Sequence, residues 1–434
     1  MNVLIGVTGG IAAYKVCTVV STLAKADVTV RVLMTDQAQS FVSALTFAAL
    51  SRQIVYTDQD FWSHQQGKPL HIELGEWADV LVIAPLSANT LGKLAHGLAD
   101  NLLTNTVLAS TCPVLLAPAM NTDMWQQAAV QANWHQLVEL SGELTESRFH
   151  QVGPGSGRLA CDRIGTGRMA EPSEIVASIY SLLHTKGKRD LASKRLLIST
   201  GSTREFIDPV RFIGNPATGR MGIALAQAAS HRGADVTLVH GPLTSELAET
   251  IPTTVKQIET ITAAEMEVAM QQQLPQADWV IMSAAVADVR PSQTVSKKLP
   301  KKDLPNPLPL SFVPDIVAEL SKRKSPQQLV VGFAAQTGDI IPPARDKLRR
   351  KQLDAIVANP IDQPNSGFGS ANNQAVILLA NSNRLNGSND SSNSSSDSTL
   401  SADIPECSII QVPQGSKLNL AHKLYDQLLS IKLS

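Results

Sequence analysis

Short apolar runs alternate with amphipathic stretches along the N-terminal half of the chain. Residues 3–7 (VLIGV) and 28–34 (VTVRVLM) are typical of buried strands, and the segment between them, IAAYKVCTVVSTLAK, has helical periodicity. Two further apolar runs, at 77–85 (WADVLVIAP) and 114–120 (VLLAPAM), also predict strands. Strands that alternate with helices at this spacing predict a parallel sheet with helices on both faces.

The same pattern restarts in the second half. A strand and a Thr-Gly-Ser turn are predicted at 195–203, a helix at 219–233 and another strand in ADVTLVHGP, and ADWVIMSAAVAD at 277–288 echoes WADVLVIAPLSAN. A chain of 434 residues is too long for one core. We therefore predict an α/β protein with two Rossmann-like doubly wound domains in tandem, 1–188 and 189–434, joined near the polar segment 184–194.

Residues 381–403 (NSNRLNGSNDSSNSSSDSTLSAD) interrupt this pattern, because almost all of them are Ser, Asn or Asp. Such a segment buries too little apolar surface to offset the entropy of ordering. We predict a disordered insertion between two late strands.

Composition and charge narrow the class of protein. The chain is 43% hydrophobic and 17% charged, with a formal net charge of -1, so its electrostatics favour neither nucleic acid nor an anionic membrane as partner. The first residues read as a strand and turn, not as a signal peptide, and no apolar run approaches the ~18 residues of a membrane span. The four cysteines are far apart and fit no zinc or redox spacing. We expect a soluble, cytoplasmic protein.

Candidate chemistry in the first half lies where predicted strands end. The turn Thr8-Gly9-Gly10 lies between a strand and a helix, a place where backbone N–H groups bind phosphate, although glycines at such turns are often only geometric. A Ser-, Thr- and Asn-rich stretch, 84–104, follows another strand. Asn121 follows a third, where it could equally cap the next helix. His71 is a lone histidine, a residue that is more often structural than catalytic.

The second half contains no GxxxxGK[ST] motif, so a Walker-type phosphate loop is excluded. It offers instead GNPATGRMG (214–222) at a helix start and Asp288 after a strand. The lysines of 296–302 (SKKLPKK) are typical of a solvated loop when taken alone. Lys347 and Lys351 are four residues apart, on one face of a predicted basic helix.

Several multi-residue segments give the chain a family resemblance. The first half contains, in the order found in flavin-dependent phosphopantothenoylcysteine decarboxylases, HIELGEWADVLVIAP, APLSANTLGKLAHGLADNLL, PAMNTDMW and ACDRIGTGRM. The second half resembles phosphopantothenate–cysteine ligases in TREFIDPVRFIGNPATGRMG, AAVADVRP, KKLPK, PDIVAEL and GFAAQT. Over nearly its whole length the chain resembles bifunctional coenzyme A biosynthesis proteins, whose first domain is flavodoxin-like.

For the first domain the resemblance implies an FMN-dependent decarboxylase of 4'-phosphopantothenoylcysteine that yields 4'-phosphopantetheine. It implies that FMN is bound by Gly9, Gly10, Ser87, Asn89 and Thr90. His71 would serve the initial oxidation, Asn121 would hold the substrate carboxylate, and Cys161 would donate a proton from a glycine-rich mobile flap. Asp162 follows this cysteine where the family often has glycine, and a carboxylate there disfavours the thiolate.

For the second domain the resemblance implies ligation of cysteine to 4'-phosphopantothenate through an acyl-cytidylate, with CTP and Mg²⁺. It implies catalytic roles for Asn215 and Lys298 and a Mg²⁺ contact at Asp288. The implied CTP contacts are Met282, Ser283, Ala284, Asp288, Lys298, Pro314, Asp315, Ile316, Val317, Phe333, Lys347 and Lys351.

The resemblance also implies a homo-oligomer, with trimeric decarboxylase units and dimeric ligase units that combine into a closed assembly such as a dodecamer. Two other functions compete with it. A nicotinamide-dependent oxidoreductase would need a GxGxxG turn, which both first turns lack. A regulatory flavin-binding protein without catalysis would need neither His71, Asn121 and Cys161 together nor a complete second domain.

Overall fold

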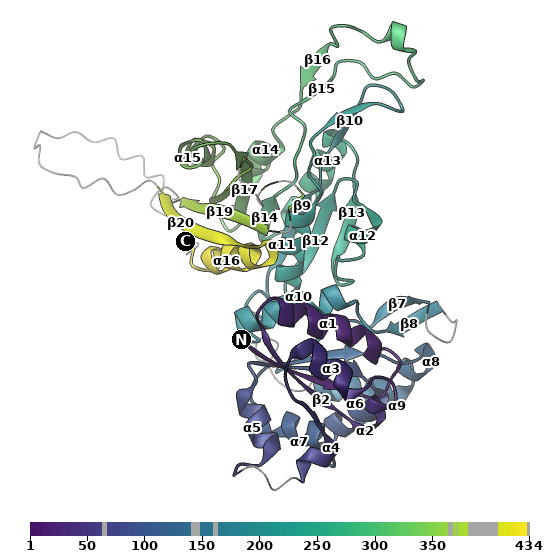
Figure 1. Ribbon diagram of the computed structural model, residues 1–434. Coiled ribbons are helices and arrows are strands. Elements are labelled where there is room, and N and C mark those ends of the chain that lie inside the picture. The colour runs from purple at the N-terminus through teal and green to yellow at the C-terminus, as the bar shows by residue number, and fades with distance from the viewer. Residues whose placement is uncertain are drawn as a thin grey trace, which may run out of the picture. The chain divides into compact units, whose positions relative to one another are not determined.

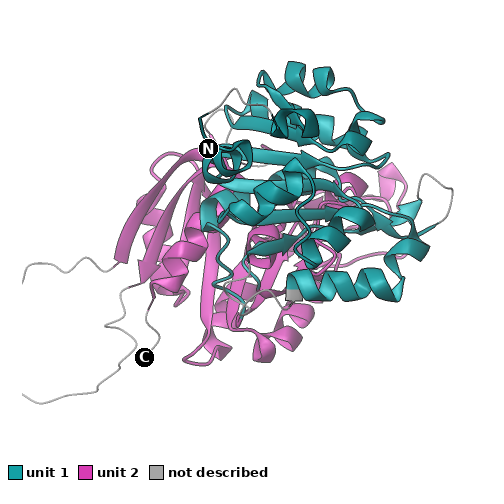
Figure 2. Cartoon of the chain, turned by 90° about the horizontal axis from the view of Figure 1, so that it is seen from below, with its two compact units in different colours: residues 1–192, 231–233 teal, residues 193–230, 234–434 magenta. Residues whose placement is uncertain are grey.

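A computed structural model of the chain describes residues 1–62, 67–139, 148–158, 164–362, 367, 369–370, 372–380 and 407–431. The predicted disordered insertion, 381–403, and Cys161 lie outside these residues. The chain divides into two compact units, shown in Figure 2. Unit 1 comprises Met1–Ala192 and His231–Gly233, and unit 2 comprises Ser193–Ser230 and Ala234–Ser434.

Within the described residues, unit 1 is built on a six-stranded parallel sheet in the order β3-β2-β1-β4-β5-β6 (Figure 1). The strands are β1 (Asn2–Val7), β2 (Thr29–Met34), β3 (Val55–Thr57), β4 (Val80–Leu86), β5 (Val114–Pro118) and β6 (Phe149–Gln151). An antiparallel ribbon of β7 (Gly155–Arg158) and β8 (Ile164–Arg168) follows. The chain reverses its direction of travel across the sheet between β1 and β4, and such switch points hold ligands in open α/β sheets.

The helices of unit 1 cover both faces of this sheet, which confirms the predicted doubly wound class. They are α1 (Ala13–Lys25), α2 (Asp36–Gln39), α3 (Ala44–Ser51), α4 (Asp58–Phe61), α5 (Leu70–Trp77), α6 (Ala88–Ala95), α7 (Leu102–Ala109), α8 (Thr122–Trp125), α9 (Ala128–Trp134), α10 (Pro172–Thr185) and a π-helical turn, His135–Glu139. Helices α1, α3 and α10 share one face, and α5, α6 and α7 share the other.

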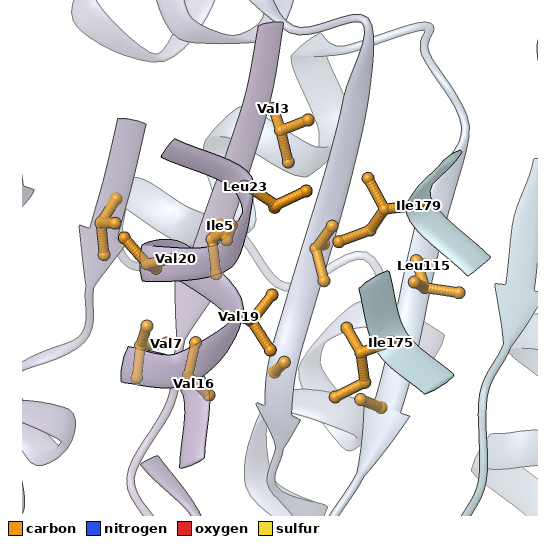
Figure 3. Close-up of a cluster of buried hydrophobic side chains, with 14 of the residues drawn as sticks. Val3, Ile5, Val7, Val16, Val19, Val20, Leu23, Leu115, Ile175 and Ile179 are labelled. Atoms are coloured by element: carbon orange, nitrogen blue, oxygen red, sulfur yellow. The ribbon is translucent and has the colours of Figure 1, made fainter. Parts of the chain in front are cut away.

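Helix α1 shows why this sequence folds as it does. Its buried Val16, Val19, Val20 and Leu23 recur at helical spacing and pack on alternate residues of β1, together with α10 (Figure 3). Each such buried aliphatic side chain contributes roughly 1.5–3 kcal/mol relative to exposure. This packing fixes the start of α1 at the carboxyl end of β1, which places the Thr8-Gly9-Gly10 turn at the switch point.

Unit 2 contains, among the described residues, an eight-stranded sheet in the order β13-β12-β9-β14-β17-β18-β19-β20, parallel except for the last two pairings. Its strands are β9 (Arg195–Thr200), β12 (Asp235–His240), β13 (Lys256–Glu259), β14 (Trp279–Met282), β17 (Leu329–Gln336), β18 (Ala355–Pro360), β19 (Asn372–Ala380) and β20 (Cys407–Ser416). The switch point lies between β9 and β14. Strands β19 and β20 flank the predicted insertion.

The helices of unit 2 also divide between two faces. They are α11 (Arg220–His231), α12 (Ser245–Ala248), α13 (Ala263–Gln273), α14 (Ile316–Arg323), α15 (Ile341–Arg350), α16 (Lys417–Leu429) and short 3₁₀ turns at Leu274–Gln276 and Lys301–Asp303. Helices α13, α14 and α15 pack on one face. On the other face α16 lies against α11, where the Tyr425 hydroxyl donates to the Leu225 carbonyl oxygen at 2.8 Å.

Two antiparallel ribbons extend the β9–β14 side of unit 2: β10 (Arg204–Phe206) with β11 (Phe212–Gly214), and β15 (Val289–Pro291) with β16 (Leu310–Phe312). The β15–β16 ribbon projects away from the sheet in Figure 1. Its Phe312 is 88% exposed, which is unusual for a large aromatic side chain. In the described part of the chain, no helix is both long enough and apolar enough to span a membrane.

Candidate functional site

In unit 1, the turn between β1 and α1 presents unpaired backbone donors. Helix α1 has no side-chain N-cap and no acidic residue in its first turn. Among the described residues, the N–H groups of Gly9 to Ala12 donate to no acceptor. A helix start with free N–H groups favours an anion, because the donors and the helix dipole act in the same direction.

A chain of hydrogen bonds connects this turn to the ends of the neighbouring strands. The buried Thr8 hydroxyl donates to the Pro85 carbonyl oxygen at 2.6 Å and accepts from the Ser87 N–H at 3.0 Å. Ser87 in turn caps α6 by accepting from the Thr90 N–H at 3.3 Å. The five residues predicted to hold a flavin therefore lie on two adjoining turns, those after β1 and β4: Gly9, Gly10, Ser87, Asn89 and Thr90.

Asn121 lies at the same edge, at the end of β5. The Ala119 N–H donates to the Leu86 carbonyl oxygen, which connects this strand end to β4. Asn121 caps α8, because its Oδ1 accepts from the Asp123 N–H at 2.7 Å. The position of Asn121 is therefore compatible with both interpretations, a helix cap and a ligand contact.

The β7–β8 ribbon packs directly on the Asn121 turn, and its glycines are what permits this. The Met120 N–H donates to the Gly167 carbonyl oxygen at 3.0 Å. A Cβ on Gly167 would collide with the Met120 carbonyl oxygen, and one on Gly165 would collide with the Thr122 side chain. At these two positions glycine allows close approach, a packing role in addition to the mobility expected from the resemblance. Cys161, within the segment that β7 and β8 flank, lies outside the described residues.

In the described part of the chain, no contact connects His71 to the two turns predicted to hold the flavin, those after β1 and β4. It is the second residue of α5 and its ring meets Phe61 edge-on, with 5.6 Å between centroids. Its Nδ1 is buried without a hydrogen-bond partner. No hydrogen bond from the described residues therefore fixes this nitrogen.

Unit 2 has a cavity of about 640 Å³ at the carboxyl edge of its sheet, within the size range of small-molecule sites. The cavity brings together Asn215 and eleven of the predicted nucleotide contacts, namely Met282, Ser283, Ala284, Asp288, Pro314, Asp315, Ile316, Val317, Phe333, Lys347 and Lys351. These residues come from the ends of β14 and β17, from the start of α14, and from α15 and its C-cap. Lys298 is exposed and does not line the cavity.

The turn before α11 repeats the arrangement of unit 1. The Thr200 hydroxyl, at the end of β9, donates to the Gly219 carbonyl oxygen at 2.8 Å. The N–H groups from Thr218 to Met221 donate to no acceptor in the described part of the chain. The side chain of Asn215 contacts the loop that follows β14. Its Nδ2 donates to the carbonyl oxygens of Ala285 and Val286, at 3.3 and 3.1 Å. Asn215 also lines the cavity.

Charges gather at the α15 end of the cavity. Lys351 pairs with Asp315 at 2.8 Å. Burial lowers the pKa of the half-buried Lys347, and Lys351 and Arg350 lower it further, while Asp288 and Asp315 act in the opposite direction. Across the described residues, no group of three or more His, Cys, Asp or Glu side chains could hold a metal ion by itself.

The loop that carries Lys298 is anchored by Asp208, which sequence reasoning missed. Asp208 is fully buried, pairs with Arg211 at 2.6 Å, and accepts from the Leu299 N–H at 3.2 Å. Burial opposes its ionisation, but hydrogen bonds from the Val210 N–H and from Arg211 hold the pKa of this carboxyl well below its usual range. A charged aspartate thus fixes the lysine loop at Leu299, the residue next to Lys298.

Sequence reasoning also missed Lys417 and Asn373, which line the cavity from α16 and β19. Asn373 lies between the motif GFAAQT and the insertion, and Lys417 lies beyond the insertion, so both are outside every segment that carried the resemblance. Only the antiparallel return through β19 and β20 brings Lys417 to this edge. No signal in the local sequence marks it.

Both halves of the chain match known protein families. Residues 1–184 match the Flavoprotein family, and residues 191–404 match the DNA/pantothenate metabolism flavoprotein C-terminal domain. The Coenzyme A biosynthesis bifunctional protein CoaBC of Bacillus subtilis (strain 168) is 42% identical over 382 residues, which are 87% of this chain and 90% of that protein. A Cysteine/Cysteine sulfinic acid decarboxylase from an unknown prokaryotic organism is 43% identical over 340 residues, 78% of this chain and 91% of that protein.

Among solved structures, the crystal structure of the C-terminal domain of a CoaBC protein matches 56% of this chain and 96% of its own, with 29% identity and a TM-score of 0.42.

Fold and comparisons together define a two-domain enzyme, a flavoprotein unit followed by a unit with a cavity of small-molecule size. The chain belongs to the family of bifunctional coenzyme A biosynthesis proteins. It combines a decarboxylase and a ligase in one polypeptide, as the resemblance implied. The alternatives, a nicotinamide-dependent oxidoreductase and a non-catalytic flavin-binding subunit, are set aside by this membership.

Replacement of Thr8 by Val tests the connection between the two flavin turns. The substitution keeps the shape but leaves the buried Ser87 N–H and Pro85 carbonyl without their partner, at a cost of about 1–3 kcal/mol. We expect flavin affinity to fall about tenfold or more, measured by flavin fluorescence on release. Thr106→Val, which removes a buried helix-internal hydroxyl bond in the same unit, is the matched control and should leave flavin affinity unchanged.

Replacement of Asp208 by Asn tests the anchor of the lysine loop. We expect ligase activity to fall while flavin binding and decarboxylation persist, because the affected contacts lie in unit 2. A carboxyl with a depressed pKa stabilises the fold above its unfolded pKa of about 4, and that stabilisation is lost as pH falls through its folded value. The deficit in the unfolding midpoint of the variant should therefore shrink below about pH 4. A deficit independent of pH would contradict this role.

Proposed function

We propose that unit 2 ligates cysteine to 4'-phosphopantothenate with CTP and Mg²⁺, and that unit 1 decarboxylates the product with FMN as its flavin. The observation that carries the proposal is the cavity of unit 2, which gathers eleven of twelve predicted nucleotide contacts in one place. The similarity to CoaBC proteins supports both activities.

In the ligase step, the carboxylate of phosphopantothenate attacks the α-phosphorus of CTP, and pyrophosphate leaves. The cysteine amine then attacks the acyl-cytidylate, forms the amide and displaces CMP. Negative charge builds up on phosphate oxygens in the first step, so cations are what the site must supply. Lys347 and Lys351 serve the nucleotide from α15, and Lys298 joins them from the loop anchored by Asp208.

Asp288 and Asn215 complete this assignment. Mg²⁺ is usually held by one or two carboxylates together with substrate phosphates and water, so a dedicated protein cluster is not required. Asp288 lines the cavity and is the carboxylate we assign to it. Asn215 uses Nδ2 to bind its neighbouring loop, which leaves Oδ1 to accept from the incoming amine.

In unit 1, the free N–H groups of Gly9 to Ala12 fit the phosphate of FMN, and Ser87, Asn89 and Thr90 adjoin it. A bound flavin supplies the oxidation and reduction at the thiol-bearing carbon that make loss of carbon dioxide possible. Asn121, at the start of α8, holds the substrate carboxylate. His71 assists the oxidation, and Cys161 donates the final proton.

A second candidate for unit 1 comes from the relative named a cysteine/cysteine sulfinic acid decarboxylase, which is as similar to this chain as the CoaBC protein. Unit 1 would then decarboxylate free cysteine or its sulfinate. The complete cavity of unit 2 favours the pantothenate-linked substrate, because a decarboxylase that acts on free cysteine would not need a product made by unit 2.

We also propose that the chain forms a homo-oligomer in the cytoplasm, through trimers of unit 1 and dimers of unit 2. The exposed apolar side chains on the ribbons of unit 2, Phe312, Leu310, Val210 and Phe212, support the pairing of unit 2.

Mass spectrometry of one reaction mixture tests the proposal. The mixture contains the purified full chain with FMN, phosphopantothenate, cysteine, CTP and Mg²⁺. We expect a product that has gained cysteine and lost carbon dioxide, together with CMP, and no product when CTP is omitted. Decarboxylated cysteine formed without CTP would instead establish the second candidate. A cysteine adduct that keeps its carboxylate would contradict only the assignment of unit 1 and would leave that of unit 2 standing.

The same assay with Cys161→Ser separates the last step from the earlier ones. We expect the decarboxylated product to accumulate in its oxidised form, two hydrogens short of the normal product, because the proton donor is missing. Cys17→Ser, a substitution of another free cysteine in unit 1, is the control. Normal amounts of reduced product from Cys161→Ser would contradict the role of this thiol.

A further inference from the structure

Glu171, which none of the roles above uses, connects two segments of unit 1 that are far apart in the sequence. It occupies the N-cap position of α10, yet in the described part of the chain its side chain makes no capping hydrogen bond. Its Oε1 lies instead 2.9 Å from the Nζ of Lys15 and 2.6 Å from the Nη2 of Arg168. One carboxylate oxygen therefore bridges the first turn of α1 and the last residue of β8.

The packing of α1 on α10 brings Glu171 to Lys15. Val19 follows Lys15 by four residues on α1, and Ile175 follows Glu171 by four residues on α10. Residues at this spacing share a helix face, and both apolar side chains belong to the same core (Figure 3). The Lys15 side chain is only 15% exposed and lies in a first turn, where the helix dipole disfavours a cation. Lys15 therefore needs a counter-ion, and Glu171 supplies it.

Arg168 carries the connection onward to the β7–β8 ribbon. The residue before it, Gly167, accepts at its carbonyl oxygen from the Met120 N–H, next to Asn121. A Cβ on Gly157 of β7 would lie 3.4 Å from the Nη1 of Arg168, so the guanidinium also lies along the other strand of the ribbon. The guanidinium thus links the bridging carboxylate to both strands and to the turn that the ribbon covers.

Glu171 is the one acidic residue that pairs with either cation among the described residues. Glu174, one turn further along α10, pairs with neither, and burial together with the charge of Glu171 raises the pKa of its carboxyl. Single exposed ion pairs contribute little to stability, whereas charges joined in a network contribute more. Lys15, Glu171 and Arg168 form such a network, with one member mostly buried.

We propose that Glu171 is a positioning residue of unit 1. Through Lys15 and Arg168 it fixes the β7–β8 ribbon relative to α1, so that the turn beneath the ribbon keeps the geometry in which Asn121 receives the substrate carboxylate. The inference rests on the proposed decarboxylase function, which gives Asn121 that role. Glu171 acts on the reaction through its two partners.

Hydrogen–deuterium exchange of the full, flavin-loaded chain tests the bridge without any turnover. We expect amides of β8 to exchange roughly three- to tenfold faster in Glu171→Gln, because the ribbon opens more often without its network. About 1 M salt should narrow this difference, since the screening length falls to about 3 Å. Glu174→Gln, on the same helix, is the matched control and should exchange as the parent does. Equal exchange in the parent and Glu171→Gln would overturn the proposal.

A double-mutant cycle separates the bridge from an effect of Glu171 on the start of α10. Lys15→Met removes the partner on α1 and leaves the N-cap residue of α10 in place. We expect it to speed exchange in β8, and to add nothing further when Glu171→Gln is already present. Additive effects of the two substitutions would mean that they act independently, and would overturn the bridge. Arg168→Met takes the place of Glu171→Gln in the cycle if that variant does not fold.

Steady-state decarboxylation of 4'-phosphopantothenoylcysteine then tests the consequence for the reaction. We expect the KM of Glu171→Gln to rise about three- to tenfold, with a smaller change in kcat and unchanged flavin affinity. Faster exchange in β8 with both kinetic constants unchanged would overturn the positioning role. A parent protein that shows the bridge by exchange but does not decarboxylate this substrate would overturn the proposed function and leave the bridge standing.

Discussion

Unpaired backbone N–H groups at the first helix of each unit are the constraint on which the sites depend. In both units the first strand ends at a switch point of the sheet, and the next helix begins without an internal partner for its first amides. Such donors are costly to leave unsatisfied unless water or a ligand meets them. A threonine at each strand end, Thr8 or Thr200, holds the turn in place through its hydroxyl. Asn121 in unit 1 and Asn215 in unit 2 lie at the same sheet edges as these two turns.

The sites of the two units differ in the kind of group that they present. The flavin turn of unit 1 relies on backbone donors and hydroxyl groups, with Thr8, Ser87 and Thr90 in one hydrogen-bonded series. Unit 2 relies on side-chain cations, some of them without a counter-ion. That difference follows the chemistry, because phosphoryl transfer builds up charge on phosphate oxygens and flavin binding does not.

Patterns in the sequence were enough to predict the architecture, but they predicted only part of each site. Apolar runs and turn glycines predicted both doubly wound sheets, because buried parallel strands and amphipathic helices leave periodic signals. The turns at Gly9 and Gly219 were found for the same reason. Lys417 was not, since two antiparallel strands bring it to the site from beyond the insertion. Spatial neighbours of that kind leave no local pattern. The packing role of the glycines at 165 and 167 was not predicted, because a glycine needed for close approach looks the same in the sequence as one needed for motion.

The central claim is that a phosphate group meets the free amides at the start of α1 and of α11. The most direct test is a cryo-electron microscopy structure of the full chain with FMN, phosphopantothenate and a non-hydrolysable CTP analogue bound. The account predicts the FMN phosphate within hydrogen-bond distance of the N–H groups of Gly9 to Ala12, and a substrate phosphate beside those of Thr218 to Met221. Phosphates bound elsewhere, with these amides in contact only with water, would contradict it.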